Sequence, residues 1–351
     1  MKTVFHVICR PDGGGAEFLV RELVRILPNY GYKTFAIYFY NPTKVKLREN
    51  EICLNLSSAR SIKAIFSLRK TLKKLNFNEK SILHTHLTWP LYYCSFAFPN
   101  IRNKFHTEHN TSNKRRRFSL LKLLEKKIYS KNKIIICISN AVKKSLSNWI
   151  EDKNQRLITI SNGIRIFPLK KQIRSNPNKV RLISIGSLTD KKGFDIALNA
   201  ISKLGDLIES YIILGEGPLR KKLEKLVSKY SLNKIVKMPG HVEDVFSYIN
   251  NADLCIMPSR VEGFGLAALE VLSAGLPLIA SNVEGLKDIS NSDNTILFKS
   301  EDIYSLRNSI ILASKKLVGN KKLAKSGREH ALSFSLEKMA KNYADVYDKI
   351  L

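Results

Sequence analysis

The stretch Glu262-Gly-Phe-Gly-Leu-Ala-Ala-Leu-Glu270 joins a short apolar run to a predicted helix and places two carboxylates eight positions apart. Glu262 lies in the glycine turn, and Glu270 is expected about two turns into the helix. A helix N-terminus after such a turn presents backbone N–H groups suited to phosphate, and an acid within the helix can accept hydrogen bonds from both hydroxyls of a ribose. Because Gly-Phe-Gly has no structural need for a neighbouring acid, the stretch predicts a nucleotide site in a strand, turn and helix of an α/β domain.

The second half of the chain repeats this order of an apolar run, a glycine turn and a helix. A strand candidate at Val180 to Ile185 leads into Gly186-Ser-Leu-Thr-Asp-Lys-Lys-Gly193, and a later one leads into Leu214-Gly-Glu-Gly-Pro218. The first turn carries Lys192 near a helix start, so the helix end and one ammonium group can bind a diphosphate. The second turn, which carries Gly215, is equally well explained as a tight connection.

Apolar runs and helical patterns also alternate in the first half, beginning with Thr3 to Cys9 and Ala16 to Leu27. Such alternation is typical of a parallel sheet covered by helices. The first turn, Gly13-Gly-Gly-Ala-Glu17, opens a helix, and its glycines allow a ligand to approach the backbone closely. It lacks the glycine spacing of a dinucleotide site, so a plain turn is an equally good interpretation.

Two groups of histidines end two further strand candidates of the first half. They are His84-Thr-His86 and His106-Thr-Glu-His109. Ligands of open α/β sheets bind outside the carboxyl ends of the strands, so both groups are placed where a binding site is expected. Their spacing would also suit a metal, but no cysteine or carboxylate partner is suitably spaced. We therefore expect no metal site.

The length of 351 residues favours two domains. No apolar run approaches the roughly 18 residues of a membrane span, and the N-terminus does not have the form of a signal peptide. The odd number of five cysteines favours reduced thiols over disulfides, and a cytoplasmic protein is expected. The expected boundaries are 1–167 for the first domain, 168–179 for a polar linker, 180–333 for the second domain and 334–351 for an amphipathic helix that packs back on the first.

The formal net charge of +29 indicates a polyanionic neighbour, either a nucleic acid or an anionic membrane. The charge is concentrated between residues 101 and 150, where thirteen Lys or Arg face two acids. Here Lys114, Arg115, Arg116 and Arg117 precede a predicted basic amphipathic helix. Such a helix is typical of a membrane surface, although its apolar stripe would also suit packing on its own domain.

The order of these motifs resembles the retaining glycosyltransferases of family 4, the group 1 glycosyltransferases of the GT-B class, over essentially the whole chain. The residues that carry the resemblance are Gly13-Gly-Gly-Ala-Glu17, His109, Ser161-Asn-Gly-Ile164, Gly186 to Gly193, Gly215-Glu-Gly-Pro218 and the pair Glu262 and Glu270. The resemblance implies two Rossmann-like domains that face each other across a cleft. The N-terminal domain would bind an acceptor, and the C-terminal domain would bind a nucleotide-diphosphate-sugar.

The resemblance also implies a role for each matching residue. His109 and Glu262 would be the catalytic residues beside the transferred sugar, Lys192 would bind the donor diphosphate, and Glu270 would bind the ribose. The remaining implied contacts are Gly186, Gly215, Gly263, Phe264, Gly265 and Leu266 on the donor side, and Gly14, Gly15, Glu17 and His86 on the acceptor side.

Two positions depart from the family pattern. Ser187 stands where an arginine commonly contacts the donor phosphates, and Lys191 or Arg260 are the candidates to replace it. Arg165 stands where an aspartate often follows Asn-Gly-Ile. The resemblance otherwise implies transfer with retained configuration, without metal or cofactor, and with the leaving phosphate stabilised by helix amides and Lys192.

The predicted partners are a nucleotide sugar, a glycan or glycolipid acceptor of surface polysaccharide or lipopolysaccharide synthesis, and the inner face of an anionic membrane. Two alternatives remain. A nucleotide-sugar epimerase would use the same nucleotide cleft without an acceptor. A nucleic-acid-binding protein would explain the charge, but no RNA-type aromatic platform, helix-turn-helix signal or zinc spacing accompanies it, so no nucleic acid is expected.

Overall fold

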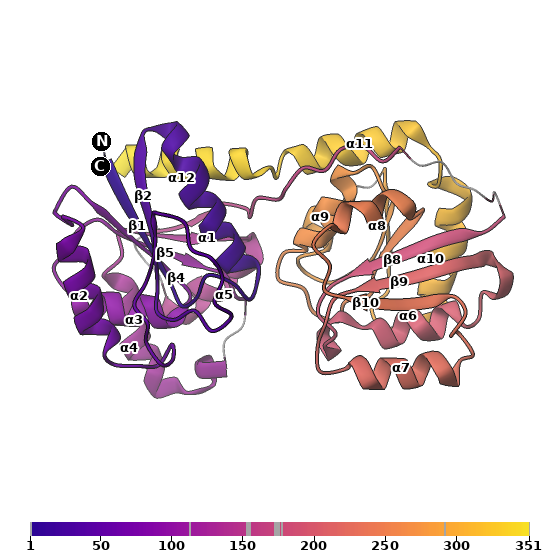
Figure 1. The fold of residues 1–351 in the computed structure, drawn as a ribbon, viewed down its shortest axis with the longest axis horizontal. Helices are drawn as coiled ribbons and strands as arrows, with labels where there is room; N and C mark the ends of the chain where they lie inside the picture. The colour runs from indigo at the N-terminus through magenta and orange to yellow at the C-terminus, as the bar shows by residue number, and fades with distance from the viewer. Residues whose placement is uncertain are drawn as a thin grey trace. The chain divides into compact units, whose positions relative to one another are not determined.

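The computed structural model describes residues 2–111, 114–151, 156–171, 176, 178–290 and 293–350. The chain divides into two units, each of which is described by itself (Figure 1). Unit 1 comprises Met1–Gly163 and Leu336–Leu351, and unit 2 comprises Ile164–Ser335. Among the described residues, no helix combines the length and the apolar character that a membrane span requires.

Within its described residues, unit 1 has a seven-stranded parallel sheet in the order β3-β2-β1-β4-β5-β6-β7. The strands are β1 (Lys2–Ile8), β2 (Tyr32–Tyr38), β3 (Glu51–Cys53), β4 (Ile82–His86), β5 (Lys104–Glu108), β6 (Ile134–Cys137) and β7 (Leu157–Thr159). The helices are α1 (Gly15–Ile26), α2 (Ala64–Lys74), α3 (Thr88–Ala97), α4 (Ser119–Ser130), α5 (Asn140–Ile150) and α12 (Leu336–Ile350), with 3-10 turns at Leu27–Tyr30 and Lys114–Arg117.

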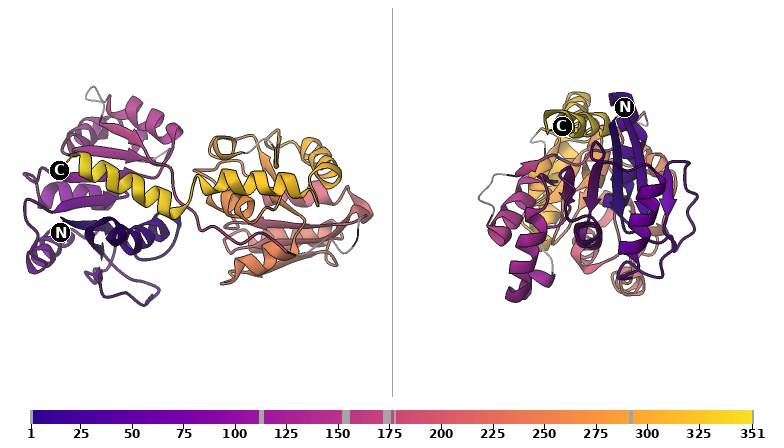
Figure 2. Two further views of the ribbon diagram at one scale, coloured as in Figure 1. Left: turned by 90° about the horizontal axis from the view of Figure 1, so that it is seen from above. Right: turned by 90° about the vertical axis from the view of Figure 1, so that its left-hand side faces the viewer.

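Side chains that alternate along the strands form two cores in unit 1. Val4 packs with α1 and α12 on one face of the sheet, and Phe5 packs with α2 and α3 on the other. Figure 2 shows α12 lying against unit 1 although it ends the chain. Its Tyr343 and Tyr347 are buried among the strands of this face. The last helix is therefore part of the core of the first unit.

Unit 2 has, in the part of it that is described, a six-stranded parallel sheet in the order β10-β9-β8-β11-β12-β13. The strands are β8 (Val180–Ile185), β9 (Ile208–Leu214), β10 (Val236–Gly240), β11 (Leu254–Met257), β12 (Leu278–Ser281) and β13 (Thr295–Phe298). The helices are α6 (Phe194–Ile201), α7 (Arg220–Lys229), α8 (Val245–Asn251), α9 (Leu266–Ser273), α10 (Ile303–Lys316) and α11 (Lys321–Leu332), with 3-10 turns at Asp190–Lys192, Gly205–Leu207 and Lys287–Ile289.

Helices cover both faces of the second sheet. Helices α6, α7 and α10 share one hydrophobic core, and α8, α9 and α11 lie over the other face (Figure 1). Both sheets have the strand order of Rossmann-type folds, in which the chain starts in the middle, moves to one edge and then returns to build the other side. The predicted α/β class with two Rossmann-like sheets is confirmed.

The chain crosses between the units earlier than the predicted linker. Ile164 already belongs to unit 2, and its N–H donates to the Phe334 carbonyl. The Phe167 N–H donates to Ser273 Oγ, and the Lys170 N–H donates to the Ala274 carbonyl. The described beginning of the predicted 168–179 linker is therefore bonded along unit 2. Residues 172–175 and 177 of this prediction lie outside the described residues.

Candidate active site

An ion pair between Lys192 and Glu262 lies at the centre of the carboxyl edge of the second sheet. Lys192 follows β8 and Glu262 follows β11. These strands are neighbours in the sheet although β9 and β10 separate them in the chain, so their ends flank the point where the strand order reverses. Ligands of open α/β sheets bind at this point. Lys192 Nζ lies 2.6 Å from Glu262 Oε2, and the two side chains are 20% and 13% exposed. Both groups are thus partly accessible and already engaged with each other.

The glycine turn before α9 presents its backbone rather than its side chains. Phe264 is buried, and its ring packs edge-on against Phe334 with 5.9 Å between the centroids. Gly265 is the N-cap of α9 with a φ of +83°, and a Cβ at this position would lie 2.8 Å from Ile289. Since glycine has no side-chain oxygen to cap the first turn, the first N–H groups of α9, beginning with Leu266, suit a bound anion. Any donor contact of Phe264 or Gly265 must therefore come from the backbone.

Glu270 lies on α9 with an unusually basic carboxyl group. The helix begins at Leu266, so Glu270 is just over one turn from its start, closer to the glycine turn than the expected two turns. Burial raises the pKa of Glu270 to about 7, and the positive charge of Arg165 partly offsets this. Arg165, which departs from the family pattern, thus lies within electrostatic reach of the predicted ribose ligand. A carboxylate that is short of hydrogen-bond donors is well suited to accept two hydroxyls.

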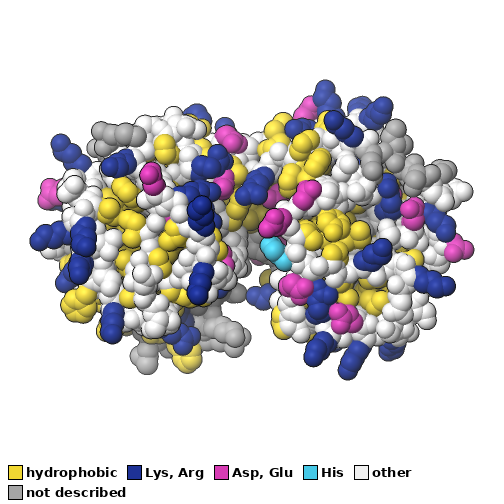
Figure 3. Space-filling model, viewed as in Figure 1, with side chains coloured by type: hydrophobic (Ala, Val, Ile, Leu, Met, Phe, Trp, Pro, Cys, Tyr) yellow, Lys and Arg dark blue, Asp and Glu magenta, His cyan; other side chains and the backbone are white. Residues whose placement is uncertain are grey.

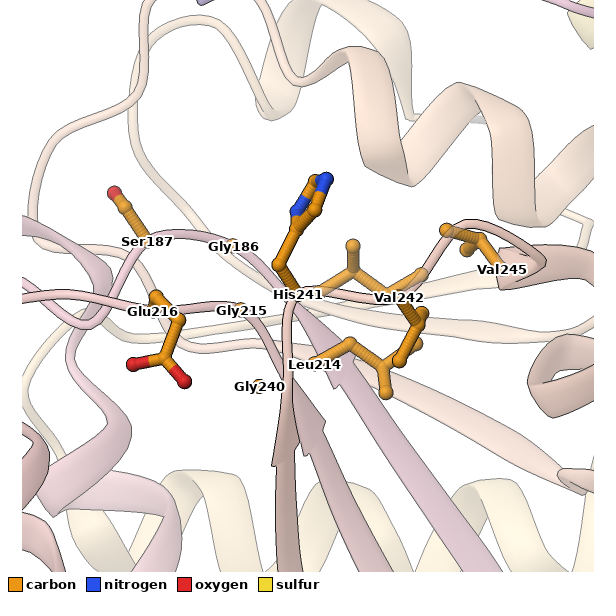
Figure 4. Close-up of a pocket in the computed structure, with 10 residues that line it drawn as sticks. Gly186, Ser187, Leu214, Gly215, Glu216, Gly240, His241, Val242 and Val245 are labelled. Atoms are coloured by element: carbon orange, nitrogen blue, oxygen red, sulfur yellow. The ribbon is translucent and has the colours of Figure 1, made fainter. Parts of the chain in front are cut away.

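A pocket of about 400 Å³ lies at the ends of β8, β9 and β10 (Figure 4), and one of its lining residues, Gly186, lies against the Lys192 side chain. Gly186 and Gly215 are among its lining residues, and the side chains of Ser187 and His241 stand on either side of Gly186. A Cβ at Gly215, where φ is +135°, would lie 2.1 Å from the Gly186 carbonyl oxygen. Gly215 is therefore needed for the close packing of the two turns, whereas a Cβ at Gly186 would meet only the Lys192 side chain, at 3.2 Å.

His241 and its neighbour Val242 line this pocket but are not among the residues expected from the sequence. They directly follow Gly240, the last residue of β10. The rule that ligands bind at the carboxyl ends of parallel strands predicts such a position for both residues, because the apolar run from Ile235 to Met238 has the pattern of a buried strand.

Arg260 does not offer a free cation to the donor site. Its guanidinium donates to both carboxylate oxygens of Asp195, at 3.0 and 2.8 Å, and to Glu301 at 2.9 Å. Asp190 lies 3.6 Å away as a third acid. Of the two candidates to replace the arginine missing at position 187, Arg260 is thus already neutralised, whereas Lys191 is exposed.

The corresponding edge of the first sheet carries the glycine turn and the histidines. Gly14 and Gly15 are exposed at the start of α1, while Glu17 is buried. Burial raises the pKa of Glu17, and the Arg10 guanidinium lies 3.9 Å from its carboxylate. The exposed glycine backbone is therefore the accessible part of this turn, whereas the Glu17 side chain, expected on the acceptor side, is buried.

His109 follows β5 and is half-buried, so a ligand can reach it. Burial lowers the pKa of His109 to about 4. His86, which was expected on the acceptor side, is only 1% exposed, and its Nδ1 lies 3.3 Å from His109 Nε2. The expectation for His86 needs correction, because this ring lies behind His109 and is not on a surface that an acceptor reaches.

Two of the basic residues before α4, Arg115 and Arg116, are also turned inward. Arg115 contacts the Glu125 carboxylate at 3.5 Å and donates to Thr88 Oγ1 at 2.6 Å. Arg116 lies 3.6 Å from the Glu108 carboxylate and donates to Ser145 Oγ at 2.9 Å. These two guanidinium groups hold unit 1 together and do not form an open basic patch, which corrects the expectation for them. The side chains of Lys114 and Arg117 lie outside the described residues.

Two family models match consecutive parts of the chain. One, described as Glycosyltransferase Family 4, matches residues 13–166, and the other, Glycosyl transferases group 1, matches residues 166–330. An uncharacterized glycosyltransferase of Methanocaldococcus jannaschii is 27% identical over 100% of this chain and 99% of its own length. A UDP-Gal:alpha-D-GlcNAc-diphosphoundecaprenol alpha-1,3-galactosyltransferase of Escherichia coli is 26% identical over 84% of this chain and 81% of its own.

Solved structures share the fold. HepE of Anabaena, crystallised in complex with UDP-glucose, superposes with a TM-score of 0.80 at 15% identity and covers 99% of each chain. At this level of identity the likeness concerns the architecture alone, namely two Rossmann-like units in one chain.

Proposed function

Because this chain belongs to the group 1 glycosyltransferases of family 4, we propose that it moves a sugar from a nucleotide-diphosphate-sugar to a glycan or lipid-linked acceptor, with retention of configuration and without a metal. The observation that carries the proposal is the pair Lys192 and Glu262, 2.6 Å apart, at the point where the strand order of unit 2 reverses. A cation for the diphosphate and an acid for the sugar meet there beside the first turn of α9.

The pocket in unit 2 suits the nucleoside part of the donor. Its volume of about 400 Å³ falls in the usual range of small-ligand sites, and three strand ends surround it. Glu270 is the acid for the ribose hydroxyls. A uridine nucleotide is the first donor to test, since HepE of Anabaena binds UDP-glucose on the same fold.

The chemistry requires a stabilised leaving group rather than a strong base. As the bond between the anomeric carbon and the diphosphate breaks, negative charge develops on the departing phosphate. Lys192 and the first N–H groups of α9 are fixed donors for that charge. Glu262 would lie beside the transferred sugar and accept hydrogen bonds from its hydroxyls. The acceptor hydroxyl would attack from the face that the diphosphate leaves.

The acceptor would bind to unit 1, at the exposed backbone of Gly14 and Gly15 and near His109. An acceptor of surface polysaccharide synthesis carried on a lipid diphosphate is the best-supported class, because the Escherichia coli galactosyltransferase acts on a diphosphoundecaprenol-linked sugar. Arg10, beside the glycine turn, is a cation that could meet such a diphosphate.

The donor site is tested with a panel of UDP-, GDP- and ADP-sugars in the presence of EDTA. Donor hydrolysis and thermal shift are measured for the wild type, for Glu270→Ala and for the matched surface variant Glu329→Ala, which lies on α11. We expect one nucleotide class to stabilise the wild type and Glu329→Ala, and to stabilise Glu270→Ala at least tenfold less strongly in apparent Kd. Binding that requires added Mg²⁺ or Mn²⁺, or that is equal in all three proteins, would contradict the proposal.

We also propose that unit 1 rests on the anionic face of a membrane. Leu123 is 75% exposed on α4, with Leu124 and Lys127 exposed beside it. An exposed leucine pair beside a lysine on one helix is typical of an interfacial helix. On the face in Figure 3, Lys and Arg side chains are scattered over the surface among fewer acids, so the net charge of +29 acts as a broad field in addition to this helix.

Vesicle sedimentation tests the membrane surface. We expect binding to vesicles with about 30% phosphatidylglycerol and little binding to phosphatidylcholine alone, because anionic lipids attract basic surfaces. Roughly 0.5 M NaCl should weaken the binding, because salt screens surface charges. Leu123→Asp should weaken binding at least fivefold, and the control Leu312→Asp, at an exposed leucine of α10 in unit 2, should not. Equal binding of both variants would refute α4 as the contact.

A further inference from the structure

A chain of three hydrogen-bonded imidazoles ends at His109. His6 lies on β1, and its Nδ1 is 3.0 Å from Nε2 of His86 at the end of β4. His86 Nδ1 is in turn 3.3 Å from His109 Nε2. His6 and His86 are both fully buried. The half-buried ring of His109 at the sheet edge is therefore held in place by the rings of His86 and His6, which no ligand reaches.

Burial keeps these three rings neutral. It lowers the pKa of His6 to about 3 and of His109 to about 4, and it holds the pKa of His86 well below its ordinary value, because the interior disfavours the imidazolium ion. A neutral imidazole has one N–H donor and one acceptor nitrogen. In a chain of such rings, the direction of one hydrogen bond therefore fixes the direction of the next.

His6, the ring farthest from His109 in this series of imidazoles, sets the direction of the hydrogen bonds. His6 Nε2 is buried and has no hydrogen-bond partner among the described residues. Buried N–H groups without an acceptor are rarer in proteins than acceptors without a donor. The proton of His6 is therefore best placed on Nδ1, from which it is donated to His86 Nε2. His86 then carries its own proton on Nδ1 and donates it to His109 Nε2, so the proton of His109 is on Nδ1.

We propose that His6 and His86 are positioning residues that hold His109 in the tautomer protonated at Nδ1. This arrangement keeps His109 Nε2 occupied as an acceptor and leaves Nδ1–H as the donor available to a ligand. The consequence for catalysis rests on the proposed function: His109 donates a hydrogen bond to an oxygen of the sugar and does not act as a base.

A metal site is the competing explanation of the same cluster. His6, His84 and His86 each have a ring nitrogen within 4.8 Å of the others. However, His84 has both nitrogens engaged, with Nδ1 2.5 Å from the Tyr347 hydroxyl and Nε2 2.8 Å from Thr107 Oγ1. Its ring stacks on His86 at 4.5 Å and 13°, so the lone pairs of the two rings do not converge on one point. The geometry favours hydrogen-bonded rings over metal ligands.

The tautomer is measured directly on the full chain labelled with ¹⁵N in its histidine rings. Long-range ¹H–¹⁵N spectra distinguish a protonated from an unprotonated ring nitrogen, and His109→Gln identifies the signals of His109. We expect Nδ1 of His109 to be protonated and Nε2 to be unprotonated, both in the free protein and with saturating UDP. A protonated Nε2 would overturn the proposal. So would stoichiometric changes of the His6 and His86 signals on addition of Zn²⁺ alone.

Substitutions at His86 test the positioning role. His86→Leu removes the donor, so we expect His109 to show a mixture of tautomers and kcat to fall at least tenfold, with the donor KM changed less than twofold. His86→Gln retains an N–H donor and should restore the tautomer and most of kcat. His84→Gln is the matched control: it changes an equally buried ring of the same cluster that makes no hydrogen bond to His109, and the tautomer should be unchanged.

Two results separate this inference from the proposed function. An unaltered tautomer of His109 in folded His86→Leu would overturn the positioning role whatever the enzyme does. The predicted tautomer in a protein that hydrolyses no nucleotide sugar would sustain the positioning role and refute the proposed function instead.

Discussion

Replacing Glu270 by Gln should stabilise the unliganded protein above neutral pH while it weakens nucleotide binding. The side chain is half-buried on α9, and burial raises its pKa from 4.5 to about 7. An ionised carboxylate at this position is therefore unfavourable until hydroxyl donors reach it. Gln has the same shape but has one acceptor oxygen in place of two, and it carries no charge to be desolvated.

The magnitude follows from the pKa. A rise from 4.5 to about 7 corresponds to about 3 kcal/mol, at 1.36 kcal/mol for each tenfold change in proton affinity. Between these pH values the native state binds more protons than the unfolded state, so the contribution of Glu270 to the free energy of unfolding falls as the pH rises. The loss is complete above pH 7. Glu270→Gln should thus be equal to the wild type near pH 4.5 and up to about 3 kcal/mol more stable near pH 8.

Urea unfolding of both proteins at about pH 5 and about pH 8 measures this difference, and Glu329→Gln on the exposed face of α11 is the control. UDP titrations at the same pH values give the functional counterpart. The wild type should bind UDP more weakly as the pH falls below 7, and Glu270→Gln should bind weakly at every pH. An equal difference in stability at both pH values would refute the burial argument.

Three further changes have expected outcomes. Lys192→Met should lower kcat about a hundredfold in a donor-hydrolysis assay, because the leaving phosphate loses its fixed cation. Gly215→Ala should destabilise the protein by more than about 2 kcal/mol in urea, because the new Cβ would lie 2.1 Å from a carbonyl oxygen at a positive φ. Asp253→Ala should cost about 3 kcal/mol in the same assay, because Arg181 would lose a carboxylate that accepts two hydrogen bonds at 3.0 Å and is almost fully buried.

The sequence predicts the middle of each unit better than its edges. The strands that carry long apolar runs and glycine turns, such as β8 and β11, coincide with strand candidates. Strand β3 is absent from them because Glu51–Cys53 has only three residues, too few for an alternating pattern, and is fixed by pairing with β2. Helix α10 is not among the predicted helices, although its Leu306, Ile310, Ala313 and Leu317 recur at helical spacing.

In the site, the sequence predicts the positions of the functional residues but not their partners. Local patterns place Glu262, Glu270 and Lys192 at the carboxyl edge of one sheet. They cannot reveal which charges are already neutralised, because the partners are distant in the chain. Arg260 pairs with Asp195, 65 positions away, and His86 meets His6, 80 positions away. Only the tertiary structure shows that an apparently available cation is engaged or that a candidate ligand is buried.

The ion pairs of Arg260 and Lys192 determine which cations a diphosphate would meet under the proposed function. Arg260 is committed to three acids and Ser187 supplies no charge, so Lys192 and the exposed Lys191 remain as the candidate cations for the donor. In the unliganded protein Lys192 is bonded to Glu262. A diphosphate that binds at the helix end must therefore take Lys192 from Glu262, and the same exchange leaves the Glu262 carboxylate free to accept hydroxyls of the sugar. Donor binding and preparation of the sugar contact then become one event, because a single ammonium group serves two anions in turn.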